Sequence, residues 1–358
     1  MKEKSYSLSQ LLGLCSVVAL TPALRLLPAA PARLAGQGAW LSVLLALPAA
    51  VLYGLFLWRF SHRRLPGESL SALWQRAAGP RAGAVLLAAA GLWLLFYAAF
   101  TLRAGAERLI ETVYPRSHRT LFIVPLAALA AFAASRNTLQ LARMAKLVLP
   151  LLVGAIVLTL CFALPGLEPA SLLPLPESGD SLPLGTLPTL DAALLVLTLF
   201  YFLSDALHGP GRYRAVAARI LLLGLLLALV VAVTVGSFGP TLTARLTQPY
   251  FSLVRNLVLF ENLERMEALL VTLWLFSDFL LVAALFLLAR RCLAPLLGEK
   301  KWLPAALGVL ALLTACLLAP GAAAYARLSE RWIPAVNFCV SLLLIPGVYL
   351  AGRLRRRL

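Results

Sequence analysis

The chain has 358 residues, of which 61% are hydrophobic and only 13% are charged. A soluble globular domain is closer to half apolar and about a quarter charged, so the composition excludes an ordinary soluble protein. The net charge of +17 does not indicate nucleic-acid binding, because Lys and Arg lie between apolar segments and form no single basic face.

Apolar runs long enough to cross a hydrocarbon core of about 30 Å recur along the whole sequence. They predict an all-α polytopic membrane protein in which residues 1–358 form a single transmembrane domain. About ten spans are expected, at residues 8–30, 40–58, 84–104, 119–134, 138–164, 189–207, 216–238, 267–289, 302–320 and 333–352.

Charge distribution predicts the orientation of these spans. One side of the membrane receives 21 of the 32 Lys and Arg residues, and the opposite side receives most of the acids. The positive-inside rule therefore places both termini in the cytoplasm, consistent with an even number of spans.

Two features of the first span leave alternatives open. Two lysines, the apolar residues 11–20 and the following LPAAPARLAG also fit a cleaved secretory signal. Pro22, three residues before Arg25, predicts either a helix broken near residues 20–22 or a simple proline kink. A break would expose backbone groups that membranes tolerate only beside protein or a wet cavity.

The connections after the second and fifth spans have distinct characters. Residues 67–79 place Leu70, Leu73, Trp74 and Ala77 on one helical face, with Glu68 in the first turn, and predict a short amphipathic helix at the cytoplasmic surface. Residues 165–188 hold six prolines, three acids and no base, and predict an extended external loop.

Residues 239–274 are too polar to cross a membrane and too apolar for an ordinary linker. An apolar face recurs at spacings of three and four, at Tyr250, Val254, Leu257, Phe260 and Leu263. The pattern predicts an outer re-entrant or interfacial segment that serves as a lid or docks a partner. A charged rim favours docking, and consists of Glu261, Glu264, Arg265 and Glu267.

No catalytic or metal-binding motif occurs in the sequence. The three histidines fall in loops, and the five cysteines have neither metal-ligand nor redox spacing. We therefore expect neither an enzyme nor a bound cofactor or metal.

Asp278 is the clearest polar residue inside a span. An aspartate at a helix centre costs about 3 kcal/mol on insertion scales, so it is expected to face an interior partner, a cation or a polar ligand. The alternative is a protonated Asp278 that is hydrogen-bonded to a neighbouring helix.

Other polar and aromatic residues in the spans have two interpretations each. Asp205 fits an interfacial ion pair better than a ligand contact, and Arg103 and Glu107 can satisfy each other at a spacing of four. Tyr97 and Tyr201 lie inside spans, where they either pack against neighbouring helices or line a ligand cavity.

Several segments together resemble the B subunits of spore nutrient-germinant receptors, which are spore germination permeases of the amino acid–polyamine–organocation superfamily. They follow the order expected for that family and read LAGQGAW, LPGESLSALWQRAAGP, NTLQLARMAKLVLPLLV, GPTLTARLTQPYFSLVR and LERMEALLVTLW. The match extends over nearly the whole chain.

The resemblance implies a fold of two inverted five-helix repeats with a site at the membrane midplane. It implies ligand contacts from the first helix (Leu20, Thr21 and Pro22), the sixth (Phe200, Tyr201 and Ser204), and the third and eighth (Tyr97, Ser277 and Asp278). This sequence has no Gly or Pro between Asp191 and Leu207 that would break the sixth helix, and an acid at Asp278 indicates a different ligand or a bound cation.

The resemblance also implies a small nutrient ligand, often an amino acid, and A-type and lipoprotein C-type partner subunits in the inner spore membrane. The receptor is one hypothesis, in which ligand binding shifts the bundle and the partners respond. A secondary transporter for amino acids or organic cations is the second. A membrane scaffold without its own ligand is the third, and a cavity filled by side chains around Tyr97, Tyr201 and Asp278 would favour it.

Overall fold

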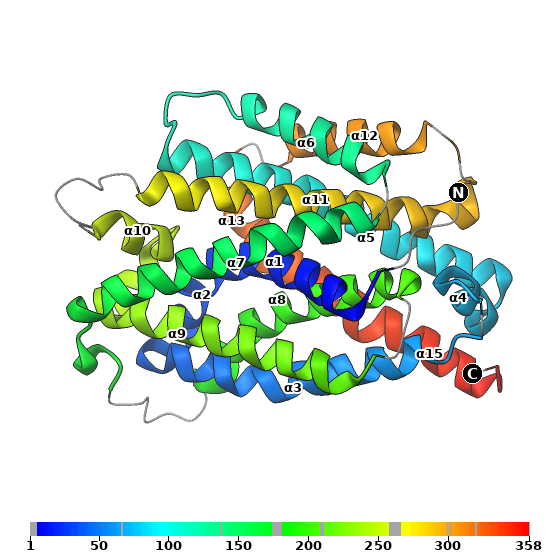
Figure 1. Ribbon diagram of the computed structural model, residues 1–358, viewed down its shortest axis with the longest axis horizontal. Helices are drawn as coiled ribbons and strands as arrows, with labels where there is room; N and C mark the ends of the chain where they lie inside the picture. Colours follow the sequence, from blue (N-terminus) through cyan, green and yellow to red (C-terminus); the bar gives the residue numbers. More distant parts are fainter. Residues whose placement is uncertain are drawn as a thin grey trace.

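The computed structural model describes residues 6–65, 67–136, 138–173, 181–207, 211–257, 266–298, 300, 302–318 and 321–357. Within these residues the structure is built from helices, and an isolated bridge between Tyr6 and Leu207 is the one extended pairing. The long helices lie roughly side by side along one direction (Figure 1). The all-α prediction is confirmed.

The described residues contain helices at the positions of the ten expected spans. Eight helical segments are long and apolar enough to cross a membrane, and two further apolar helices of 15 residues each, α6 and α12, are shorter. The helices of the first nine spans are α1 (Leu8–Leu26), α3 (Ala39–Ser61), α5 (Pro80–Thr112), α6 (Thr120–Ala134), α7 (Thr138–Ala163), α8 (Ser181–Leu203), α9 (Tyr213–Arg245), α11 (Met266–Leu297) and α12 (Leu303–Leu317).

The tenth span is one helical run assembled from five pieces. They are α13 (Ala322–Arg327), η5 (Leu328–Trp332), α14 (Ile333–Phe338), η6 (Cys339–Leu344) and α15 (Ile345–Leu354). The two η segments are π-helical, and each precedes a helical piece that carries proline in its first turn. Because proline has no N–H for the usual bond to the fourth preceding residue, a wider turn before it accommodates the missing bond.

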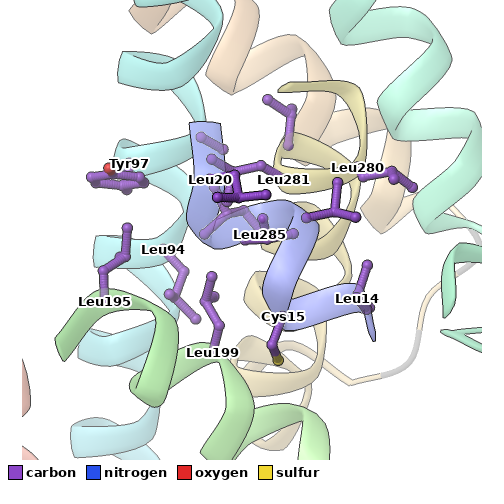
Figure 2. Packing of buried hydrophobic residues seen from close by; sticks show 14 of the residues in the cluster. Leu14, Cys15, Leu20, Leu94, Tyr97, Leu195, Leu199, Leu280, Leu281 and Leu285 are labelled. Atoms are coloured by element: carbon purple, nitrogen blue, oxygen red, sulfur yellow. The ribbon is translucent and has the colours of Figure 1, made fainter. Parts of the chain in front are cut away.

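Four helices form the interior of the bundle. About 70% of the apolar window of each of α1, α5, α8 and α11 is buried, against 33% for α3, α7, α9 and the tenth span. Figure 2 shows apolar side chains of these four inner helices meeting around Leu20, Leu199 and Leu285. The inner helices are the first, third, sixth and eighth spans, which are the ones expected to frame a site.

Small residues bring α5 and α11 together into the most extensive helix pair of the fold. A Cβ on Gly91 of α5 would lie 2.8 Å from Cys292 Cβ of α11, closer than real Cβ atoms approach. Close backbone approach at glycine is a common way to pack membrane helices. It holds the residues of α5 and α11 that form the site described below.

Several helix boundaries differ from the predictions; α5 and α11, for example, end at Thr112 and Leu297, each eight residues beyond the predicted span. The first span ends at Leu26, and residues 29–35 form α2 (Ala29–Ala35), which leads into α3 through a short turn. The prediction of an extended loop over residues 165–188 is wrong for its last residues, because α8 begins at Ser181 and they are helical. Proline is tolerated there because Pro183 lies in the first turn, where N–H groups lack intrahelical partners.

The seventh span also extends further than expected. It bends at Gly239, whose φ of 72° a residue with a side chain rarely adopts, and continues through Pro240 to Arg245. The loop before α8 contains residues 174–180, which lie outside the described part.

Two short amphipathic helices lie at opposite ends of the bundle (Figure 1). α4 (Leu70–Ala78) lies at the end where α15 finishes, and α10 (Pro249–Asn256) lies at the other end. The predicted apolar face of α4 is buried, but it packs against α5 and α15, with Ser69 and not Glu68 capping the helix. A Cβ on Gly83 would lie 2.4 Å from the Trp74 carbonyl oxygen, so only glycine permits this contact.

α10 confirms the helix predicted before the eighth span. Tyr250 and Val254 are buried against the neighbouring helices α9, α11 and α1. Phe260, Leu263 and the rim residues Glu261, Glu264 and Arg265 lie outside the described residues, so the choice between a lid and a docking surface stays open.

Candidate ligand-binding site

A small cavity lies among α1, α5 and α11. Its volume is about 10 Å³, which is room for about one water molecule. It is lined by Pro22, Arg25, Tyr97, Thr101, Ala104, Arg108, Asp278 and Leu281. Pro22, Tyr97 and Asp278 were predicted site residues, and the structure brings these three together.

The eighth-helix aspartate forms an ion pair across this cavity wall. Arg108 Nη2 donates to Asp278 Oδ2 at 2.7 Å, and both side chains are less than 5% exposed. The Arg108 guanidinium also lies over the Trp274 ring, 5.1 Å from its centroid. Gly105 leaves space for the carboxylate, since a Cβ there would lie 3.0 Å from Asp278 Oδ2. Asp278 therefore faces an interior partner, as predicted.

Arg25 is the second cation of the site. Its guanidinium lies over the Phe100 ring, 4.9 Å from the centroid. The buried Nε of Arg25 has no hydrogen-bond partner among the described residues, and the same holds for Asp278 Oδ1. Both residues line the cavity, and because buried polar groups normally have partners, these two atoms need an explanation.

A polar link between α8 and the tenth span lies beside this site. Asn337 Nδ2 donates to Asp191 Oδ1 at 2.7 Å and to the Asp191 carbonyl at 2.8 Å. Asp191 lies within electrostatic range of Arg25. The Asn337–Asp191 contact joins the sixth helix to the tenth at the level of the cavity.

Sequence reasoning missed Arg108, Asp191 and Asn337. Arg108 continues the series Tyr97, Thr101 and Ala104 at spacings of four, three and four, which is one helical face pointing at Asp278. That spacing could have identified Arg108. No comparable signal marked Asp191, which lies in a threonine- and leucine-rich stretch.

The first helix is not broken at its predicted site residues, Leu20, Thr21 and Pro22. α1 is helical throughout residues 20–22, so the broken-helix interpretation is wrong and the alternative, a proline within a continuous helix, holds. Leu20 is fully buried in the apolar core (Figure 2). Thr21 lies in the same helical turn. No run of free backbone N–H groups exists there to capture a carboxylate, so Arg25 is the donor that α1 presents.

The sixth-helix residues lie in a separate cluster near the inner end of the bundle. Tyr201 accepts a hydrogen bond from Trp74 Nε1 at 2.9 Å and stacks on Phe60 at 5.4 Å between ring centroids. Ser204 donates to the Tyr201 carbonyl, and Phe200 stacks against Trp58. None of Phe200, Tyr201 and Ser204 lines the cavity. α8 is unbroken and changes to a 3₁₀ turn only at Ser204.

Ser277 connects two inner helices. Its hydroxyl donates to the Val17 carbonyl of α1 at 2.7 Å, so it fixes α11 against α1 and does not line the cavity. The Arg103–Glu107 pair is confirmed at 2.7 Å. Asp205 is an ion-pair partner as predicted, with Arg64 at 3.0 Å.

The described residues contain no group of three or more His, Cys, Asp or Glu side chains arranged to hold a metal ion. The chemistry that the cavity offers is therefore that of charged hydrogen bonding: two guanidinium groups, one carboxylate and the Thr101 side chain, within apolar walls.

A solved membrane-protein structure resembles this chain in fold. The crystal structure of MhsT in complex with L-phenylalanine matches with a TM-score of 0.69 and 13% sequence identity, over 98% of this chain and 88% of MhsT. At this identity the likeness shows the fold, which is that of a membrane transporter. Among curated protein sequences, none matches the chain significantly.

The family comparison covers most of the chain. Residues 7–321 match the spore permease family, described as spore germination proteins. The matched region includes the first nine spans and every residue that lines the cavity. This integral membrane protein therefore belongs to the spore germination permease family.

Proposed function

We propose that the chain is the ligand-binding membrane subunit of a spore nutrient-germinant receptor, and that it holds an amino acid between Arg25 and Asp278. The observation that carries the proposal is a pair of buried atoms without hydrogen-bond partners among the described residues, Arg25 Nε and Asp278 Oδ1, whose residues line one cavity. A guanidinium complements the carboxylate of an amino acid, and a carboxylate complements its ammonium group.

Both comparisons support this assignment. The family match supports a role in germination, and with it a location in the inner spore membrane. The L-phenylalanine bound to the structurally similar MhsT supports an amino acid as the ligand class. In the receptor, the partners would be A-type and lipoprotein C-type subunits.

The small volume of the cavity links binding to a conformational change. A cavity of about 10 Å³ admits one water molecule but no amino acid, so a ligand enters only if α1 moves relative to α5 and α11. A ligand that binds the opened arrangement shifts the population toward it. Partner subunits that contact the moving helices could then respond, which is the behaviour of a receptor.

A thermal-shift screen of the purified protein in detergent against amino acids, sugars, nucleosides and polyamines tests the proposal. A ligand at about 100 times its dissociation constant adds roughly 2.7 kcal/mol of stability. We expect an amino acid to raise the melting temperature of the wild type and not of Arg25→Gln. Arg143→Gln, an exposed arginine of α7 that does not line the cavity, is the matched control and should keep the shift. A shift that survives in Arg25→Gln would refute the assignment of the site.

The small cavity also favours a second candidate, a scaffold without its own ligand. The two candidates differ in spores that carry Arg25→Gln in place of the wild-type chain. A receptor loses its response to the amino acid while the partner subunits still assemble, whereas a scaffold keeps the response. Counterflow uptake by proteoliposomes tests the transporter alternative, and uptake no higher than in empty liposomes would exclude it.

A further inference from the structure

A second and much larger cavity lies at the inner end of the bundle, beside α4. Its volume is about 810 Å³, within the range of about 300–1,000 Å³ usual for small-molecule sites. Its walls come from α4, α5, α11 and the ends of α6, α8 and α12. It shares no lining residue with the Arg25–Asp278 cavity, so the two cavities are separate.

The charged lining of this inner cavity is strongly one-sided. Four basic side chains line it, Arg136, Arg290, Arg291 and Lys300, together with a single acid, Asp205. Asp205 is already engaged, because its Oδ1 accepts from Arg64 Nη1 at 3.0 Å and from the Leu70 N–H at 2.7 Å. The acid therefore does not neutralise the basic residues.

Three of the four basic side chains have no carboxylate partner among the described residues. Arg136 lies over the Phe132 ring at 4.8 Å, Lys300 lies over the Trp302 ring at 5.5 Å, and Arg290 enters none of the described ion pairs. Arg291 is oriented by Thr138, whose Oγ1 accepts from its Nη2 at 2.7 Å. The hydroxyls of Ser71 and Ser135 add neutral donors.

Buried apolar side chains form the other walls. Leu87, Phe202, Leu288 and Leu303 line the cavity, and α6 and α12 beside it expose leucine and phenylalanine side chains along their lengths. The cavity thus combines a basic rim at the inner membrane surface with an apolar floor. Arginine and lysine in such a position match a phosphate group, which accepts several charge-assisted hydrogen bonds.

We propose that this inner cavity, lined by Arg136, Arg290, Arg291 and Lys300, binds a phosphate group, supplied by the headgroup of an anionic phospholipid of the inner leaflet. A soluble phosphate shares the same chemistry. The site is independent of the amino acid site, and its failure would leave the proposal for Arg25 and Asp278 unaffected.

The test measures melting temperature in detergent during four titrations. Dihexanoyl phosphatidylglycerol is compared with dihexanoyl phosphatidylcholine, which has the same chains and phosphodiester but a choline that cancels the negative charge. Inorganic phosphate is compared with chloride at equal ionic strength. We expect phosphatidylglycerol to raise the melting temperature saturably beyond phosphatidylcholine. A response to phosphatidylglycerol alone identifies a lipid site, and a response to inorganic phosphate as well shows that the phosphate group is sufficient.

The variant Arg290→Gln/Lys300→Gln should raise the half-saturating concentration at least about tenfold, because each lost contact is a charged hydrogen bond. Arg81→Gln/Arg214→Gln removes the same charge from exposed residues at the same end that do not line the cavity, and should leave the concentration unchanged. The single variant Arg136→Gln, at an exposed position, serves if the double variant does not fold. The proposal is overturned if neither phosphate probe exceeds its reference, or if the control pair weakens binding equally.

Discussion

Two polar clusters of the same bundle differ in how completely their groups are paired. At the central cavity, Arg25 and Asp278 each keep a buried polar atom without a partner among the described residues. At the inner end, Trp74 bonds Tyr201, and Asp205 bonds both Arg64 and the first turn of α4. Buried polar groups that are fully paired fix a structure, whereas groups left unpaired need an explanation, and a ligand is one.

The same contrast distinguishes the central site from the inner end of the bundle. α4 closes the inner end by contacts with α5, α8 and α15, including Arg355, which donates to the Ala78 carbonyl. At the central site, Asp278 joins α11 to Arg108 of α5, whereas the Ser277 hydroxyl joins α11 to the Val17 carbonyl of α1. We therefore expect opening of the central site to be a displacement of α1 against a fixed inner end.

The largest effect is expected for Asp278→Asn. The change leaves the Arg108 guanidinium buried without its counter-charge, which costs about 3–5 kcal/mol of unfolding free energy. Denaturant unfolding in detergent measures it. The double variant Arg108→Gln/Asp278→Asn should recover part of the loss, because it removes both charges. A loss below about 1 kcal/mol in the single variant would mean that the pair is not buried as described.

Tyr201→Phe should produce the next largest effect. It leaves Trp74 Nε1 buried without an acceptor, at a cost of about 1–3 kcal/mol. Amino acid affinity should not change, because Tyr201 does not line the central cavity. Tyr114→Phe, at a residue that is half exposed, is the control for loss of a phenol. If Tyr201→Phe lost affinity for the amino acid while its stability was unchanged, the ligand would bind at the Tyr201 cluster and not at the central cavity.

Gly105→Ala should act on binding more than on stability. The new Cβ would lie 3.0 Å from Asp278 Oδ2, a crowding that a shift of a few tenths of an ångström relieves, so the cost falls at the low end of about 1–3 kcal/mol. The displaced carboxylate should bind the ammonium of the ligand more weakly. Isothermal titration beside an unfolding measurement separates the two effects, and an unchanged affinity would place the ligand away from Asp278.

The apolar helices and the buried aspartate could be predicted because both follow from the cost of exposing polar groups to lipid. A run of about 20 apolar residues is visible in one dimension, and so is a lone acid within it, as at Asp278. Helix ends were less predictable, since proline is compatible with a first turn, as at Pro183. The π-helical stretches of the tenth span left no pattern that we recognised.

Depth along the bundle could not be predicted. Tyr97 and Tyr201 both lie inside apolar spans, but only Tyr97 lines the cavity. Asp191 lies at the level of the cavity, and Tyr201 follows it by ten residues, about 15 Å along the helix. Arg108 directly follows the Arg103–Glu107 pair in sequence, so its separate partner across the bundle has no signature in the local pattern. Which face of a helix points inward is decided by its neighbours, which a single sequence does not show.

The smallest effect is expected for Glu68→Gln, which tests how firmly α4 is held. The Glu68 carboxylate accepts from Arg76 Nε and Nη2, each at 2.8 Å, and this bonding lowers its pKa below the ordinary value of 4.5. Because the folded pKa is lowered, the stabilisation is present above pH 4.5 and is lost as the pH falls through the folded pKa.

Glu68→Gln should therefore lower the unfolding free energy by about 0.2–1 kcal/mol at pH 7, since the pair is partly exposed, and by less at each step below pH 4.5. Thermal unfolding of both proteins over this pH range measures the difference. In an Arg76→Gln background the difference and its pH dependence should shrink, because the group that lowers the pKa most is gone while the Leu65 N–H and Arg64 remain. A difference of undiminished size there would assign the effect to the bond between Glu68 and the Leu65 N–H, and would mean that this bond, and not the ion pair, holds the segment before α4.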